Sequence, residues 1–560
     1  MIFILKIYEK WEISMTIKRS FLVTLATAAL LAACGSNGGN TGATNGEASA
    51  VVNYVAPTEI ATMDSVLVTD MNSANYIGHV QEGLYWENDV NEIQPALAES
   101  LPEVSEDGLT YTIKMREDAT WSNGDQITAH DFVYAIQRLA KPDTAAPYSY
   151  LLAGFENAEG VLSGDQAVEE LGVEALDDYT IEIRLETPIP YIENLLAFTP
   201  LYPQNQAFVE EVGDAYGTDS DNLVFSGPFT MTEWDGTGLT WSLVKNDDYY
   251  NADDIAIDEV DVQVIKEVST NVNLFEAGDV DNSLLTGELA KQYLNHEDAV
   301  QQAKARNYWV AFNYNNEVFQ NKNLREAIDY AINNEELATN VIGDGSNPVS
   351  TFVPENFIFN PETEEDFVSE VAIEDKYDPE EAARLWALAQ DELGVETLTL
   401  NLLGDDDEKS KTTAEYIQGQ IANNLPGVTL TLQNVPKKNR LSQEDARDYD
   451  LVITGWAADF ADGINFFELF ETDGPYNRGD YSNEAYDAEI IAAKGENAND
   501  PVARWENFVA AQEVLTEDAA WIPLYQEVET QLRNPNLEGI TFRSVGNEFD
   551  LRTATLDNAE

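Results

Sequence analysis

The chain has 560 residues, of which 44% are hydrophobic and 10% aromatic, so it is long enough for several domains and is not a disordered chain. Its 30 Lys and Arg residues against 102 Asp and Glu residues give a formal net charge of −72. Such a surface repels nucleic acid and anionic lipid, so we expect no nucleic-acid partner. The negative charge could attract cationic ligands. The simpler interpretation is a solvated acidic surface suited to high salt, where screening is strong.

The N-terminal region has the plan of a secretory signal. Lys18 and Arg19 precede an apolar run at 21–33, which is too short to span a bilayer comfortably. The run ends in Leu-Ala-Ala at 31–33, directly before Cys34, and this ending resembles the lipobox of bacterial lipoproteins. The resemblance implies cleavage before Cys34 and attachment of lipid to its thiol. The alternative is an ordinary signal peptide in which small residues happen to precede a cysteine.

Two further expectations concern the same region. Met15 is the natural start of the signal, because residues 1–14 precede an already complete one. Residues 35–50 are rich in Gly, Asn, Thr and Ser and contain no core-forming side chains, so we expect a flexible tether that reaches about 20 Å. Since Cys34 is the only cysteine, intramolecular disulfides and cysteine-based metal clusters are excluded, and we expect neither a metal nor another cofactor.

Strand and helix patterns alternate along the rest of the chain, which predicts α/β domains. A tight turn at 122–125 is followed by Thr128, which should cap a helix that carries Asp131 in its first turn. His130 fits this helix start better than a catalytic role. Strands are expected at 51–55, 111–115, 179–185, 227–231, 239–244, 260–265, 308–314, 398–403 and 428–432, and further helices at 324–332 and 413–423.

The most informative stretch is 450–462. It begins as a buried strand at 451–453, and we expect the strand to break at Gly455 and to deliver Trp456 and the carboxylates Asp459 and Asp462. In α/β folds, ligand sites lie at the ends of strands, and here such an end carries an aromatic residue and an acid. The alternative is a core tryptophan beside a solvated acidic turn. A second acidic run, at 405–408, lacks the glycine of an EF-hand and is expected to be a solvated loop.

Further motifs lie at 63–64, 82–84, 107–111, 121–125, 131–138, 222–229 and 377–383, and at Tyr525. Together they resemble the oligopeptide-binding proteins of ABC importers, which belong to the family-5 extracellular solute-binding proteins. The resemblance covers roughly residues 51–555. These motifs say less about the ligand, because relatives carry dipeptides, oligosaccharides, nickel complexes or haem.

The resemblance implies a periplasmic-binding-protein-like α/β fold with two lobes that close about a hinge, and with an additional inserted domain. The expected divisions are a signal peptide at 1–33, the lipidated cysteine and tether at 34–50, a discontinuous first lobe at 51–81, 208–307 and 527–560, the inserted domain at 82–207, and the second lobe at 308–526.

The resemblance also implies site residues. Asp459 falls where the family places the carboxylate for a peptide's α-ammonium, a group that needs a charged acceptor inside a closed cleft. Trp456 would line the cleft, and Tyr148 matches a tyrosine that contacts the peptide near its N-terminus. Met71 falls where the peptide main chain pairs with protein backbone, as in strand addition.

Two positions depart from the family's pattern. In enteric relatives, a basic residue three positions before the tryptophan helps to hold the peptide's C-terminus, and this chain has Ile453 there. An aromatic residue that lines a side-chain pocket in those relatives is also missing near 434–436. We therefore expect longer peptides, or a C-terminus that is held in another way.

The function expected from the resemblance is capture of oligopeptides and their delivery to ABC transporter permease subunits. The protein would be a monomer of Gram-positive type on the outer face of the cell membrane, held there through lipid on Cys34. Within the same fold, the alternatives are a receptor for a signalling peptide or a binder of another solute. A hydrolase that uses Asp459 and Asp462 is a third hypothesis, but neither a nucleophile–base pair nor a metal set accompanies these carboxylates.

Overall fold

The computed structural model describes residues 49–373 and 376–557. Cys34, the signal sequence and nearly all of the expected tether therefore lie outside the described residues. Residues from Ala48 onward form one unit of the chain, and the description below concerns that unit alone.

The first sheet holds four strands in the order β1-β10-β9-β8. Strand β1 (Val51–Ala56) runs parallel to β10 (Glu259–Val264), and β9 (Thr240–Lys245) runs antiparallel to both β10 and β8 (Phe229–Thr232). Helix α1 (Met71–Val80), capped by the Asp70 carboxylate, packs against this sheet and contributes to its separate hydrophobic core. The strands expected at 51–55, 227–231, 239–244 and 260–265 are thus confirmed to within two residues at each end.

The second sheet is antiparallel throughout, in the order β4-β5-β7-β6. Helix α2 (Ala129–Ala140) packs on it, and the Asp131 carboxylate accepts a hydrogen bond of 2.8 Å from the Thr128 backbone N–H. The predicted helix start is therefore confirmed. His130 lies exposed in the first turn, 3.5 Å from Asp178. The strands are β4 (Glu103–Val104), β5 (Thr110–Lys114), β6 (Val173–Asp177) and β7 (Thr180–Arg184).

The third sheet is the largest and has mixed strand directions, in the order β11-β17-β12-β16-β14-β15, with β13 also paired to β17. Strand β14 runs parallel to both β15 and β16, while the other pairs are antiparallel. The strands are β11 (Asn282–Leu285), β12 (Ala299–Phe312), β13 (Asn347–Pro348), β14 (Leu398–Asp405), β15 (Val428–Val435), β16 (Leu451–Ala457) and β17 (Trp521–Arg533).

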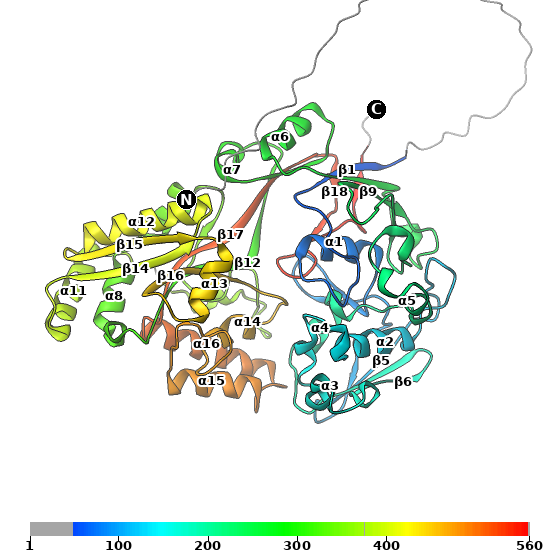
Figure 1. The fold of residues 1–560 in the computed structure, drawn as a ribbon, viewed down its shortest axis with the longest axis horizontal. Coiled ribbons are helices and arrows are strands. Elements are labelled where there is room, and N and C mark those ends of the chain that lie inside the picture. Colours follow the sequence, from blue (N-terminus) through cyan, green and yellow to red (C-terminus); the bar gives the residue numbers. More distant parts are fainter. Residues whose placement is uncertain (1–48, 374–375, 558–560) are drawn as a thin grey trace, which may run out of the picture. The chain divides into compact units, whose positions relative to one another are not determined.

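Helices pack around the third sheet (Figure 1). Helix α12 contacts β14 and β15, α13 contacts β14, and the pairs α8–α11 and α15–α16 pack side by side. The bounds are α8 (Lys322–Tyr330), α11 (Pro379–Leu393), α12 (Glu408–Asn424), α13 (Lys437–Asp445), α15 (Glu484–Lys494) and α16 (Pro501–Glu517). The shorter or peripheral elements include β2 (Tyr85–Glu87), β3 (Ile93–Pro95), α3 (Ala158–Ser163), α4 (Ile192–Ala197), α5 (Gln206–Val212), α6 (Val268–Ala277), α7 (Gly287–Tyr293), α10 (Phe367–Val371) and α14 (Ile464–Phe467).

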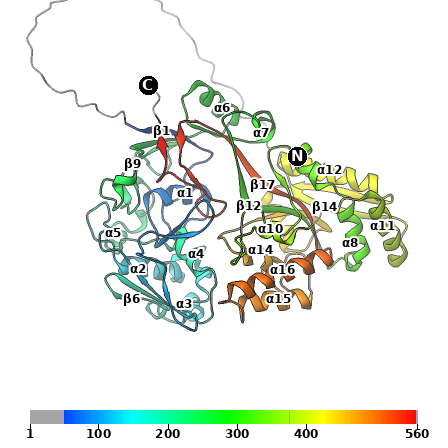
Figure 2. The same cartoon turned by 180° about the vertical axis from the view of Figure 1, so that it is seen from behind.

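Strands β12 and β17 are the longest of the described chain, and both views show them running side by side (Figures 1 and 2). Their pairing is interrupted between Ala303 and Asn307 and again between Tyr308 and Trp309. The lobe boundaries expected at 307/308 and 526/527 fall inside these two strands. A bulge at such a point bends a strand locally.

Gly455 was expected to break the strand, and this prediction is wrong. Strand β16 continues through Gly455 to Ala457, pairing with β12 as far as Arg306. The glycine serves close packing instead, because a Cβ built there would lie 2.7 Å from Cδ1 of Tyr308 and 2.9 Å from the carbonyl oxygen of Asn307.

The acidic run at 405–408 is also not the solvated loop expected from the sequence. Asp405 ends β14, and its carboxylate accepts a hydrogen bond of 2.7 Å from Arg440 Nε. Asp407 caps α12 by accepting a hydrogen bond of 2.9 Å from the Ser410 backbone N–H. Among the described residues, no helix combines the length and apolar character needed to cross a bilayer.

Candidate functional site

Asp459 follows the end of β16 in a half-buried position. Its backbone N–H donates to Oδ1 of Asn465 at 3.2 Å, but its carboxylate makes neither an ion pair nor a hydrogen bond with any of the described residues. Burial raises the pKa of this carboxyl from 3.8 to about 6. Desolvation without a compensating cation produces this direction of shift, so Asp459 is a carboxylate that lacks a cationic partner among the described residues.

Asp462, three residues later, is different. Both of its oxygens pair with the Arg504 guanidinium, at 2.6 and 2.7 Å, and Oδ1 also accepts from the Ile464 backbone N–H at 2.8 Å. Arg504 additionally donates to the carbonyl of Ala493. This buried and fully paired carboxylate ties the 460–464 turn to α16. The two acids of the motif therefore have separate roles, and Asp462 is structural.

Tyr148 lies near Asp459. The Tyr148 ring meets Phe198 edge-on, with centroids 5.2 Å apart, and its pKa is raised to about 12, first by burial and then by the negative charge of Asp459. The pKa of Tyr150 is raised in the same way and by the same carboxylate. The structure thus brings together Tyr148 and Asp459, two of the residues expected at the site. Tyr150 was not anticipated, because nothing in its local sequence marks it.

Trp456 belongs to the same neighbourhood. Its ring lies 4.9 Å from that of Tyr476, and Tyr476 in turn adds to the electrostatic environment of Tyr148. The indole Nε1 of Trp456 has no hydrogen-bond partner among the described residues. Trp456 and Tyr476 therefore form an aromatic pair next to the unpaired carboxylate.

The backbone beside Trp456 is also available. Strand β14 pairs with β16 only through Leu402–Leu451 and Leu403–Val452, whereas β12 follows β16 to its end. Within the described chain, residues 454–457 therefore have one edge without a neighbouring strand. Unpaired N–H and C=O groups on such an edge can accept an added extended chain. Sequence reasoning missed this edge because it expected the strand to stop at Gly455.

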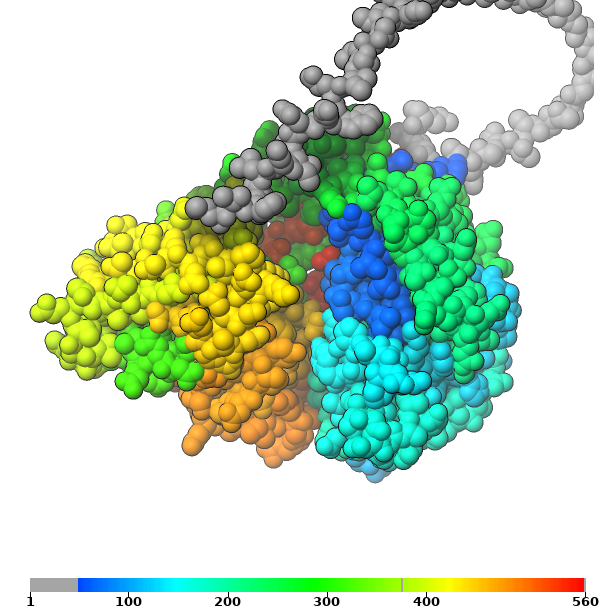
Figure 3. All heavy atoms as spheres, viewed as in Figure 1, coloured from blue at the N-terminus to red at the C-terminus, as the bar shows by residue number. Residues whose placement is uncertain are grey.

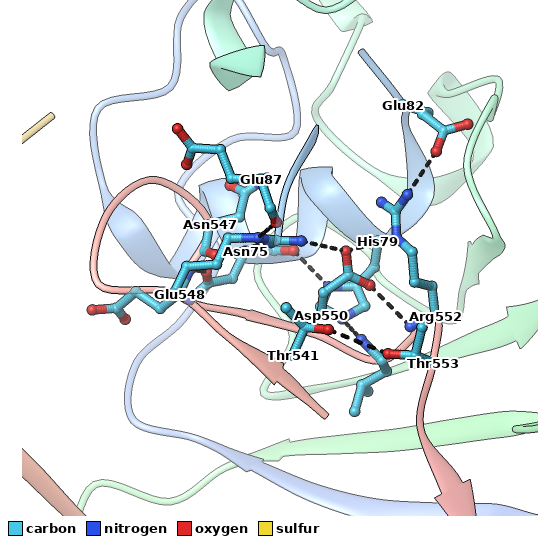
Figure 4. Close-up of polar contacts among 12 residues, drawn as sticks. Asn75, His79, Glu82, Glu87, Thr541, Asn547, Glu548, Asp550, Arg552 and Thr553 are labelled. Carbon is cyan, nitrogen blue, oxygen red and sulfur yellow. Dashed lines mark hydrogen bonds and ion pairs between the residues drawn. The ribbon is translucent and has the colours of Figure 1, made fainter. Parts of the chain in front are cut away.

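A small cavity of about 20 Å³ borders Asp459, lined also by Phe460, Trp86 and Glu87. Burial raises the pKa of Glu87 to about 7. The same cavity is also lined by Arg543, Asp550 and Arg552, which belong to a buried polar network at the C-terminal segment (Figure 4). In this network, Asp550 accepts from both Arg543 and Arg552 at 2.8 Å, and Glu82 accepts from Arg552 at 2.8 Å.

His79 completes this network. Its Nδ1 lies 2.7 Å from the Asn75 carbonyl and so carries the proton, while Nε2 accepts from the Leu551 N–H at 3.2 Å. Burial lowers the pKa of His79, so the ring is neutral at physiological pH. The positive charges of Arg543 and Arg552 are neutralised by Asp550 and Glu82, so neither of these two arginines is available to pair with Asp459.

Met71, the first residue of α1, is exposed and lies elsewhere. It lines a cavity of about 330 Å³ that adjoins another of about 370 Å³, and the two share Leu284 and Glu529. We call the pair the β17 hollow. Figure 3 shows it as a recess, with β17 in red at its floor between residues coloured yellow and blue. The Asp459 cavity shares no lining residue with the Met71 cavity, so the structure does not bring Met71 to Asp459.

The β17 hollow is lined by more acids than bases. Each lining lysine is already paired: Lys291 with Glu288 at 3.0 Å, Lys304 with Glu548 at 3.0 Å and with Glu529 at 3.5 Å, and Lys409 with Asp344 at 2.8 Å. Ile453 is buried in the hydrophobic core and carries no charge. The hollow therefore offers a ligand carboxylate no unpaired lysine.

Residues 92–478 match the family described as bacterial extracellular solute-binding proteins, family 5 middle. The chain belongs to this family. It is 33% identical to a dipeptide-binding protein of Lactococcus lactis over 518 residues, which cover 90% of this chain and 94% of the relative. The expected family is thus confirmed.

Two solved structures have the same fold. Listeria monocytogenes OppA bound to peptide is 36% identical, with a TM-score of 0.72 over 92% of this chain and 100% of that one. The pheromone receptor PrgZ is 34% identical, with a TM-score of 0.72 over 91% of this chain and 100% of that one. Its structure was solved together with its mode of peptide binding. The two-lobed α/β fold class is confirmed, while the lobe boundaries stay a prediction.

Proposed function

We propose that this protein captures oligopeptides in an extended conformation and delivers them to an ABC permease. One observation carries the proposal: a half-buried carboxylate without a cation, Asp459, stands at the end of a strand whose edge is free. A peptide offers both complements, an α-ammonium and a row of main-chain N–H and C=O groups. The L. lactis and L. monocytogenes relatives, named for dipeptide binding and bound to peptide respectively, support the same ligand class.

Peptide capture follows from these two features. The ammonium pairs with Asp459, and the main chain runs along residues 454–457 beside Trp456. Main-chain pairing gives affinity that does not depend on sequence, while the ammonium fixes which end of the peptide lies at Asp459. Tyr148, Tyr150 and Tyr476 surround the charge pair and limit its access to water.

The peptide's C-terminal carboxylate, unlike its α-ammonium, has no charged partner in this proposal. Ile453 supplies no positive charge, and the lysines lining the β17 hollow are all paired with acids. We therefore propose that the C-terminal carboxylate is not gripped and that longer peptides are accepted. Met71 lines this hollow and is placed to contact the later residues of a peptide.

Binding involves closure of two lobes about β12 and β17. The lobes proposed are 51–81, 208–307 and 527–560 for the first and 308–526 for the second, with 82–207 inserted. The bulges between Ala303 and Trp309 lie where the chain crosses from one lobe to the other, and a hinge of this kind closes over its ligand.

The setting follows from the N-terminal motif. We propose that Cys34 is lipidated and holds a monomer on the extracellular face of the membrane, beside its permease subunits. Catalysis is not part of the proposal, because Asp462, the partner that the hydrolase hypothesis assigns to Asp459, is committed to Arg504. A second candidate, a receptor for a signalling peptide, is favoured by the similarity to PrgZ.

Two measurements test the function. Native mass spectrometry of the purified protein should release peptides of mixed sequence, whereas a single defined peptide would favour the signalling receptor. Calorimetry should show that N-acetylation of a bound peptide greatly weakens binding and that C-terminal amidation has little effect. Equal affinity for the free and acetylated peptides would contradict the assignment of Asp459.

A further inference from the structure

A second carboxylate, one of whose oxygens lacks a hydrogen bond from any described residue, lines a cavity beside the aromatic pair. Trp456 and Tyr476 also line a cavity of about 50 Å³, which we call the aromatic cavity. Its walls include the rings of Trp309 and Tyr449, and Glu444 from α13 is among its lining residues. This volume holds a few water molecules or the end of one side chain.

Glu444 is almost fully buried, with 1% of its surface exposed. Its Oε1 lies 2.9 Å from Arg440 Nη1, but its Oε2 receives no hydrogen bond from any described residue. Arg478 forms a long ion pair with Oε2, with its Nη1 3.9 Å away. A buried carboxylate oxygen without a donor is costly, and here it belongs to a residue that lines a cavity.

The surrounding charges do not balance. Arg440 is shared between Glu444 and Asp405, and Arg478 donates at 2.7 Å to Asp445. Three carboxylates thus share these two guanidinium groups, and of the three Asp445 is 62% exposed and also lies near Arg447, whereas Glu444 is buried. Burial and then the charge of Glu444 raise the pKa of the Tyr449 phenol, while Arg447 and Arg478 lower it. One further positive charge would complete the cluster.

We propose that the aromatic cavity is a subsite for a lysine side chain of the bound peptide, near the peptide's N-terminus. An ammonium group supplies donors for the free Oε2 of Glu444, and the faces of Trp456 and Tyr476 attract a cation. A compact ammonium suits the small volume better than the larger guanidinium of arginine. The inference rests on the proposed function, because it assumes a peptide whose α-ammonium lies at Asp459.

The position of the lysine within the peptide follows from placing the peptide's α-ammonium at Asp459. Trp456 is three residues from Asp459 and lines the aromatic cavity. A peptide that starts at Asp459 and runs along residues 454–457 therefore passes the cavity within its first three residues. Side chains on alternate residues of an extended chain point to opposite faces, so one position should show the preference most strongly.

The test compares lysine with norleucine, which keeps the aliphatic stem and lacks the charge. Alanine hexapeptides with either residue at positions one to four are titrated by calorimetry at pH 7.5. At one of the first three positions, lysine should bind about tenfold more tightly than norleucine, as expected for a desolvated charge contact. Glu444→Gln should reduce that ratio to below about two, while norleucine peptides keep their wild-type affinity.

Two further variants control for folding. Arg478→Gln removes a competing cation, so the lysine-to-norleucine ratio should rise, which a merely damaged protein would not show. Asp131→Asn is a matched control, because Asp131 is also a buried carboxylate with a pKa raised by burial but does not line the aromatic cavity. It should leave the ratio unchanged.

The outcomes separate this inference from the proposed function. A ratio near one at every position, or a ratio that Glu444→Gln leaves intact, would overturn the lysine subsite, and the cavity would then hold water. If N-acetylation of the norleucine peptides still weakens binding in that case, peptide capture at Asp459 stands. If N-acetylation has no effect, the proposed function itself fails.

Discussion

Replacing Asp459 by asparagine should stabilise the empty protein and weaken its ligand at the same time. The folded-state pKa of about 6 lies above the ordinary value of 3.8, so the charged form is disfavoured by folding. The penalty is absent below pH 3.8, grows as the pH rises toward 6 and is complete above it. Since each pKa unit corresponds to about 1.4 kcal/mol, the full penalty is about 3 kcal/mol.

Asp459→Asn removes that penalty and keeps the shape of the side chain. At pH 7.5, urea unfolding of the ligand-free variant should therefore give a higher free energy of unfolding, by up to about 3 kcal/mol. Peptide with a free α-ammonium should bind more weakly by about 2–5 kcal/mol, the range for removing one partner of a buried charge pair. The measurements are urea titration and calorimetry on protein stripped of co-purified peptide.

Glu468→Gln is the matched control. Glu468 is half-buried beside Asp459, and its pKa is raised to about 7 by burial and by neighbouring acids. Its removal should also stabilise the empty protein, but peptide affinity should change by less than about 1 kcal/mol. Loss of stability in Asp459→Asn, or equal loss of affinity in both variants, would refute the assignment of Asp459 as the ammonium partner.

Three other predictions concern pH and packing. Peptide affinity should fall about tenfold between pH 7 and pH 5, because protonation of Asp459 near pH 6 removes the ammonium's partner, and calorimetry on Asp459→Asn should show no such acidic limb. Arg504→Ala should lower the free energy of unfolding by about 3–5 kcal/mol, since it leaves Asp462 buried and unpaired, and a loss below about 1 kcal/mol in urea titration would contradict the structural role. Gly455→Ala should cost about 1–3 kcal/mol and weaken peptide binding, because its Cβ would meet Tyr308 at 2.7 Å, whereas Gly419→Ala, with open space around it, should not destabilise.

The sequence was sufficient for elements whose local pattern and tertiary packing agree. The α2 start is an example, since Thr128 and Asp131 form their capping contact within one turn of chain. The family motifs likewise led to Asp459, and the structure then showed why that acid differs from Asp462: Arg504, which neutralises Asp462, comes from a helix 42 residues further along the chain. No local pattern contains that pairing.

The wrong predictions at Gly455 and Asp405 also arise because the residues that decide them are distant in sequence. Gly455 suggested a break because glycine often marks one, but its reason is the ring of Tyr308 on a strand almost 150 residues earlier. Asp405 was taken for a loop residue because its partner Arg440 lies across the β14–α13 contact. The free edge of β16 could not be predicted at all, since it depends on where β14 stops pairing.

The two proposed peptide contacts share one physical principle. Asp459 and Glu444 are desolvated carboxylates, whereas Lys304 and Lys409 in the β17 hollow are paired with acids of the same chain. Both make the empty protein less stable, and both would be relieved by a positive charge that only a ligand can bring. Such a site recognises positive groups of the peptide at two positions and places no requirement on the peptide's other side chains. It suits a protein that must accept many peptide sequences while recognising the end at which a peptide begins.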